Sequence, residues 1–141
     1  MAQSMTTRQG AYAESLVISW LYANGFNAFT EPNNNSEIDI IAEINHHLIP
    51  LQVKSTLETT DNDSMKFDIR VHKDKNLAYS VPMIFVFVCI ENGYIGCDLR
   101  DGGKGVEIKG KKDEYAITKE RLMSLNFLRE ENNLDIDDES W

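Results

Sequence analysis

The sequence has few cysteines, no long apolar run and a shortage of basic residues. Its two cysteines, Cys89 and Cys97, form no CxxC pair and lie at no ligand spacing from a histidine. We therefore expect no zinc site and interpret both as reduced thiols. The longest apolar stretch, 81–90, has the length of a strand, and the N-terminal residues lack the apolar core of a signal peptide. These absences predict a soluble, cytoplasmic protein that does not associate with a membrane.

Acidic residues outnumber basic ones by 23 to 14, which gives a net charge of −9. Phosphate groups bind to positive surfaces, so this charge weighs against a nucleic-acid partner. The distribution softens that objection, because residues 129–141 hold six acids and one arginine, and so carry −5 of the total. We expect one domain over 1–128, followed by an acidic, disordered tail over 129–141.

The spacing of apolar residues in the first half predicts a helix and then strands. Tyr12, Leu16 and Trp20 recur at helical spacing within 9–24, and Gly25 suits the position after a helix end. A short strand over 26–30 and a loop over 31–36 should follow. The β-branched runs 38–44 and 48–53, separated by Asn45-His46-His47, indicate a β-hairpin.

The second half continues the same mixed pattern. The apolar run 83–90 is typical of a central buried strand, and Asn92-Gly93 should turn it into a partner strand over 94–99. Thr118 should cap a final helix that reaches about Arg129. The remaining predictions are a loop over 57–64, strands over 66–71, 106–108 and 115–117, and a short helix or turn through 79. Together they predict an α/β domain with a mixed sheet of about five strands flanked by helices.

Polar residues in the hairpin form the first candidate site. Asp39 lies among isoleucines, where a carboxylate is rarely buried without a partner or a metal. Gln52 and Lys54 are two residues apart in the next strand, so both project from one face. Asp39, the Gln52 amide oxygen and the Val53 backbone carbonyl can bind a hard cation such as Mg²⁺, with Mn²⁺ as a substitute. Glu14, on the first helix, can reach the same position as a further ligand.

Three segments resemble a known family. GAYAESLVISWLYANGF, EIDIIAEI and LIPLQVKSTLE are similar to the PD-(D/E)XK nuclease superfamily, which has the restriction-endonuclease-like fold. The resemblance covers about residues 9–58 and extends more loosely through VPMIFVFVCIENGYIGCDL. In that family a helical Glu, a strand Asp and a (D/E/Q)XK pair form the metal site. By position the resemblance implies these roles for Glu14, Asp39, Gln52 and Lys54, with Lys54 orienting the attacking water and balancing charge on the scissile phosphate.

Two positions depart from the family pattern. Ile38 replaces the proline before Asp39, and Gln52 replaces an acidic ligand, which removes a negative charge. The QVK variant resembles intron-encoded homing endonucleases and bacterial or phage proteins of uncharacterised role. Gln52 can still bind a metal through oxygen, but the change also fits an inactive relative that retains only the fold.

Basic residues in the middle of the chain are candidates for contacts with the DNA backbone. Solvated turns and strand edges are an equal alternative for them. His46 and His47 are expected in an exposed turn rather than in a catalytic role. The candidate DNA-binding residues are Lys66, Arg70, Lys104, Lys109, Lys111 and Lys112.

The leading hypothesis is a Mg²⁺-dependent DNA endonuclease acting as a homodimer or higher symmetric oligomer, since one site cuts one strand. The alternative is a catalytically inactive protein of the same fold that binds a basic protein partner, as an inhibitor or immunity protein does. A small-molecule function for the α/β domain has no support in the sequence.

Overall fold

The computed structural model describes residues 5–30, 38–60, 62–69, 82–101, 105–110 and 112–139, with the side chains of 5–6 and 132–139 left out of the description. Its main element is a five-stranded sheet with strand order β1-β2-β3-β5-β6. β3 and β5 pair in parallel, and the other neighbours pair antiparallel. The mixed α/β prediction is confirmed. The strands are β1 (Asn27–Thr30), β2 (Ile40–Ile44), β3 (His47–Thr56), β5 (Met83–Cys89) and β6 (Tyr94–Arg100).

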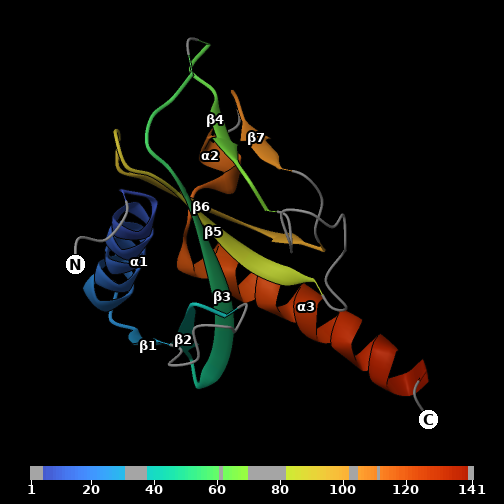
Figure 1. The fold of residues 1–141 in the computed structure, drawn as a ribbon. Helices are drawn as coiled ribbons and strands as arrows, with labels where there is room; N and C mark the ends of the chain where they lie inside the picture. The colour runs from blue at the N-terminus through green and yellow to red at the C-terminus, as the bar shows by residue number, and fades with distance from the viewer. Residues whose placement is uncertain are drawn as a thin grey trace.

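Two helices cover one face of this sheet (Figure 1). α1 (Met5–Ala23) presents Ala13, Val17 and Leu21, all fully buried, at intervals of four residues. α3 (Lys119–Glu139) contributes Leu122 and Leu125 to the same core. The alternating inward residues of β2 and β3 complete that core, as their position between helix and sheet requires.

A second core lies on the opposite face. β4 (Met65–Phe67) pairs antiparallel with β7 (Val106–Ile108), and this two-stranded sheet packs over Phe85 and Phe87 of β5. β5 is therefore buried from both sides, in agreement with its continuous apolar sequence. The short helix α2 (Lys112–Tyr115) lies beside β6.

The turns explain how the elements end. Gly25, two residues after the end of α1, has φ of +83°, a conformation that costs glycine little. The Phe26 N–H donates to the Leu21 carbonyl across it at 2.9 Å. Asn45 and His46 both have positive φ, 51° and 68°, so they form a two-residue turn that matches the twist of the β2–β3 hairpin. The predicted hairpin is confirmed, although His47 is already the first residue of β3.

Three predicted elements need correction. The strand predicted over 66–71 is β4, which ends at Phe67, and Asp68 and Ile69 lie outside it. Residues 115–117 are not a strand, because Tyr115 ends α2 and only Ala116 forms a bridge, to Gly96. The final helix does not stop near Arg129, because α3 continues to Glu139. No glycine or proline interrupts 119–139, so helical propensity outweighs the acidic composition that predicted a disordered tail. The predicted loop over 31–36 and the turn through 79 lie outside the described residues.

Two further features concern the cysteines and the length of the helices. Cys89 and Cys97 are free and buried, and burial raises the pKa of the Cys97 thiol to about 12. Among the described residues, no helix is long and apolar enough to cross a membrane.

Candidate functional site

The β2–β3 hairpin places Asp39 beside Gln52. The regular ladder ends with Ile40 opposite Leu51. The Asp39 N–H donates to the Leu51 carbonyl at 2.9 Å rather than to that of Gln52, so Asp39 lies one residue off the register of the ladder. Asp39 therefore lies next to Leu51 and Gln52, at the point where the regular pairing ends.

A backbone hydrogen bond anchors the Asp39 carboxylate. The N–H of Val53 donates to Asp39 Oδ2 at 2.8 Å. In an extended strand the N–H and C=O of one residue point to the same side, so the Val53 carbonyl also points toward Asp39. The carboxylate is thus held between Gln52 and Lys54, at the edge of β3 that β2 no longer covers.

Burial and the neighbouring positive groups shift the pKa of Asp39 in opposite directions. Partial burial raises the pKa of Asp39 above its ordinary value, while the Val53 N–H and the Lys54 ammonium act to lower it. Burial is the largest of these effects, so the net pKa is raised. The attraction between Lys54 and Asp39 requires that the two charges lie near each other.

Glu14 reaches the same location from the helix layer. It follows Ala13, which is fully buried against the sheet, and it lies half-buried at the edge of that apolar stripe. Burial raises the pKa of Glu14, and the neighbouring Asp39 carboxylate raises it further. Two carboxyl groups from different elements therefore repel each other at this point.

One contact that the sequence reasoning missed fixes α1 against β3. Gln9 Nε2 donates to Ser55 Oγ at 3.0 Å, which ties the helix to the residue after Lys54. Gln9 lies four residues before Ala13, so it belongs to the same sheet-facing stripe. That spacing and the serine directly after QVK are the two signals that could have indicated the contact.

The donor set suits a hard divalent cation. Two carboxylates, the Gln52 side-chain oxygen and the Val53 carbonyl are all oxygen ligands, which Mg²⁺ and Mn²⁺ accept, with waters completing the shell. A cation here would also offset the repulsion between Glu14 and Asp39. In the part of the chain that the structure describes, no three or more His, Cys, Asp or Glu residues group to hold a metal. The glutamine in place of a third acid accounts for that finding at this site.

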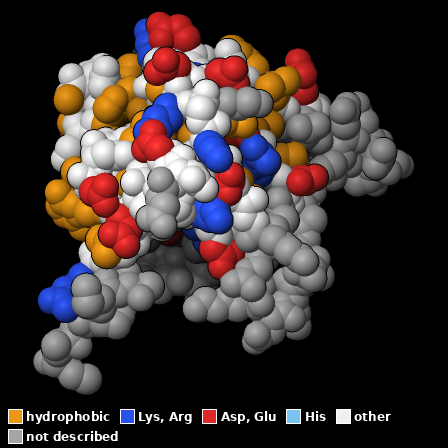
Figure 2. All heavy atoms as spheres, turned by 90° about the horizontal axis from the view of Figure 1, so that it is seen from above, with side chains coloured by type: hydrophobic (Ala, Val, Ile, Leu, Met, Phe, Trp, Pro, Cys, Tyr) orange, Lys and Arg blue, Asp and Glu red, His pale blue; other side chains and the backbone are white. Residues whose placement is uncertain are grey.

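The structure describes three of the six basic residues that were predicted to contact DNA. Lys66, on β4, is within 3.7 Å of Glu107, and the Lys112 ammonium is 2.9 Å from Asp63. Lys109 is exposed directly after β7. The face in Figure 2 shows Lys and Arg side chains interspersed with Asp and Glu. Arg70, Lys104 and Lys111 lie outside the described residues.

The two adjacent histidines differ in position. His46 is exposed in the hairpin turn, as predicted. His47 is half-buried, and its ring meets that of Phe127 on α3 edge-on, with ring centres 6.0 Å apart. Neither places a nitrogen among the contacts described around Asp39.

Comparison with known proteins places the fold. The chain matches the solved structure of a bacterial homing endonuclease, I-Ssp6803I, with a TM-score of 0.66 over 89% of this chain and 98% of that chain. The two sequences are 14% identical, so the likeness concerns the fold. No protein-family model and no curated protein matches the sequence. The predicted nuclease-like α/β fold, with its mixed five-stranded sheet and flanking helices, is therefore confirmed.

Proposed function

We propose that this chain is a metal-dependent DNA endonuclease of the PD-(D/E)XK type, which hydrolyses phosphodiester bonds. The observation that carries the proposal is the position of the Asp39 carboxylate, which accepts the Val53 N–H at 2.8 Å, between Gln52 and Lys54. Glu14 lies close enough that the charge of Asp39 raises the pKa of Glu14. The fold that this chain shares with a protein named as a homing endonuclease supports the same class of activity.

Each residue has a defined role in this proposal. Glu14, Asp39, the Gln52 side-chain oxygen and the Val53 carbonyl would hold the cation. When bound, Mg²⁺ or Mn²⁺ supplies a lowered pKa for the attacking water and charge stabilisation at the phosphate. Lys54 orients the water and offsets negative charge that develops on the scissile phosphate. Lys54 also lowers the pKa of Asp39, which favours the ionised form that binds a cation.

The assembly follows from the number of sites. One chain contributes one such constellation, and one constellation cuts one strand. Cleavage of both strands of a duplex then requires two chains, so we propose a homodimer or a higher symmetric oligomer.

Metal binding is the first test. Titration calorimetry with Mg²⁺ and with Mn²⁺ should show saturable binding to the wild type and none to Asp39→Ala. Glu114→Ala is the matched control, since Glu114 is an exposed acid on α2, and it should bind as the wild type does. Because phosphate can complete a Mg²⁺ site, the titration is repeated with DNA present. Wild-type binding that persists in Asp39→Ala would remove Asp39 from the site.

Cleavage is the second test. Nicking of a supercoiled plasmid with Mg²⁺ should be abolished by Lys54→Ala and unaffected by Lys119→Ala, which removes an exposed lysine at the start of α3. Activity that survives both Asp39→Ala and Lys54→Ala would refute the assigned site.

The replacement of an acid by Gln52 favours one second candidate, an inactive protein of this fold that binds a basic protein. The net charge of −9 and the pairing of Lys66 and Lys112 with acids agree with it. A folded wild type that binds no metal with or without DNA, yet retains a basic protein in a pull-down, would support this candidate.

A further inference from the structure

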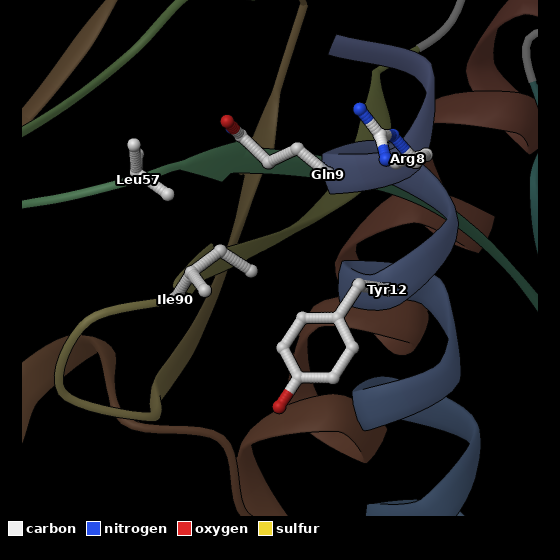
Figure 3. A pocket seen from close by; sticks show the side chains of 5 residues that line it. All are labelled: Arg8, Gln9, Tyr12, Leu57 and Ile90. Atoms are coloured by element: carbon white, nitrogen blue, oxygen red, sulfur yellow. The ribbon is translucent and has the colours of Figure 1, made fainter. Parts of the chain in front are cut away.

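A pocket of about 330 Å³ opens at the carboxyl ends of β3 and β5, and none of the predicted site residues lines it. Its walls are Arg8, Gln9 and Tyr12 from α1, Leu57 after β3 and Ile90 after β5 (Figure 3). Volumes of this order are those of small-ligand pockets. The Gln9 side chain extends from the helix over the strand ends, and the Tyr12 ring lies beside Ile90 (Figure 3).

Backbone hydrogen bonds join the two strand ends that line this pocket. The parallel pairing of β3 with β5 continues past both strands, as Ile90 N–H donates to the Thr56 carbonyl and Glu91 N–H to the Leu57 carbonyl, each at 2.9 Å. The Gln9–Ser55 bond of 3.0 Å fixes the helix wall to the same strand. The carboxyl ends of parallel strands are the positions where open α/β sheets bind ligands.

The pocket lining has a definite chemistry. The Tyr12 and Leu57 side chains are half exposed, at 51% and 50%, so an aromatic ring and an aliphatic wall face solvent together. Arg8 is exposed at the rim and makes no hydrogen bond or ion pair with any other described residue. In a chain of net charge −9, a cation that has no partner among the described residues and lies beside an aromatic ring is a feature that the metal site does not use.

Aromatic and aliphatic walls with a guanidinium at the rim match a nucleotide. Nucleobases stack on aromatic side chains with little dependence on sequence, and arginine binds the attached phosphate. The Gln9 amide, held by Ser55 through Nε2, still has its oxygen to accept a hydrogen bond from a base edge.

We propose that this pocket binds an unpaired nucleobase of the strand that is cut, stacked on Tyr12 with its phosphate at Arg8. The inference rests on the proposed function. Leu57 lies three residues beyond Lys54, about 10 Å along extended chain. That separation is on the order of two to three nucleotide steps at a rise of 3.4 Å. The pocket would therefore favour substrates that are single-stranded or unpaired beside the cleaved bond.

Methyl NMR of the full chain without metal tests the pocket directly. Titration with deoxythymidine 5′-monophosphate should shift the Leu57 and Ile90 methyl signals saturably, while deoxyribose 5-phosphate should not. Tyr12→Ala should remove the shifts and Tyr12→Phe should retain them. Tyr22→Ala is the control, because Tyr22 is a comparably exposed tyrosine on the same helix, at 57%, and lines no part of the pocket. Shifts of equal size with the sugar phosphate, shifts that survive Tyr12→Ala, or no shifts at all would overturn the proposal.

A second measurement connects the pocket to a polynucleotide. Fluorescence anisotropy of a labelled ten-nucleotide single strand in EDTA should give a dissociation constant that is about ten-fold higher for Tyr12→Ala and unchanged for Tyr22→Ala. An unchanged constant for Tyr12→Ala would overturn binding of a strand. Asp39→Ala should keep both the methyl shifts and strand binding while it loses cleavage. Binding without any cleavage by the wild type would reject only the proposed function, and cleavage without binding in the pocket would reject only the pocket.

Discussion

Two aspartates of this protein are both partly buried beside the main sheet, yet they are compensated in opposite ways. Asp98, on β6, accepts bonds from Arg100 Nε at 2.6 Å and from an Arg121 guanidinium nitrogen at 3.1 Å. Arg121 also donates to the Cys97 carbonyl and lies over the Tyr115 ring, so the cation is itself held in place. Asp39 accepts the Val53 N–H, and its charge raises the pKa of Glu14.

The difference separates a structural acid from a candidate ligand. Charge at Asp98 is neutralised within the protein, so its ion pairs join α3 to β6 and leave little for an outside cation. Charge at Asp39 is only partly offset by Lys54, and Glu14 adds a second repelling group. Folding that tolerates such repulsion is typical of sites that bind a ligand.

The largest expected effect is on cleavage. Asp39→Asn should slow plasmid nicking by about a thousand-fold or more, because a neutral amide replaces one of the two charged groups proposed to hold the cation. Asp98→Asn should remain within about two-fold of the wild-type initial rate at a temperature where both variants are folded. Equal losses of nicking rate in the two variants would contradict the assignment of Asp39 as a metal ligand and of Asp98 as a structural acid.

Bound metal should stabilise the folded protein, and this effect should depend on Asp39 and not on Asp98. At a Mg²⁺ concentration of 100 times the dissociation constant, the unfolding free energy of the wild type should rise by about 2.7 kcal/mol. Asp98→Asn should show the same increment in urea unfolding, and Asp39→Asn should show none. An increment that Asp39→Asn retains would locate the cation elsewhere.

Without metal the two substitutions should affect stability differently. Asp98→Asn should lower the unfolding free energy by about 1–2 kcal/mol, since it leaves two guanidinium groups without their acid.

The raised pKa values of Glu14 and Asp39 mean that the folded state binds more protons than the unfolded chain over the interval above their ordinary values of 4.5 and 3.8. Stability of the metal-free wild type therefore falls as pH rises through that interval.

Asp39→Asn removes one of those groups and the charge that acts on the other. Its stability should fall less steeply with pH than that of the wild type, and at pH 7 it should not be lower. The carboxamide oxygen can still accept the Val53 N–H, so the hairpin anchor is retained. Urea unfolding in EDTA at a series of pH values measures this, and a slope as steep as that of the wild type would contradict it.

The smallest effect concerns the contact that aligns α1 with β3. Ser55→Ala should cost about 0.5–1.5 kcal/mol, because the Gln9 amide loses its partly buried acceptor. Ser15→Ala is the matched control, since the Ser15 hydroxyl donates to the Tyr12 carbonyl within α1. Ser55→Thr should recover most of the loss, and failure to recover would attribute the effect to something other than the hydroxyl.

Local patterns predicted much of the fold and the centre of the site. The isoleucines around Asp39 and the alternation of Gln52 with Lys54 depend only on strand periodicity, which the chain displays directly. Gly25 after α1 and Thr118 before α3 were recognisable for the same reason, and Thr118 Oγ1 does accept the Arg121 N–H at 3.0 Å.

What was missed depends on residues far apart in the chain. The pairing of 65–67 with 106–108 builds a second layer that no local pattern announces. Lys66 and Lys112 read as free cations in the sequence, but their partners Glu107 and Asp63 are brought to them by that layer. The length of α3 does not follow from the acidic composition of 129–141, but it agrees with the absence of glycine and proline over 119–139.

The two-residue turn at Asn45-His46 has a consequence for how this chain tolerates change. Asp39 is six residues away from Asn45, about 20 Å along the strand. Ile40, Ala42 and Ile44 are fully buried at alternate positions of β2, so this core-facing set fixes the face from which Asp39 projects. The length of the turn does not decide it, because longer hairpin loops can join the same two strands. An insertion between Asn45 and His46 should therefore leave the candidate site intact, and this exposed turn is a place where the chain can gain residues without loss of its chemistry.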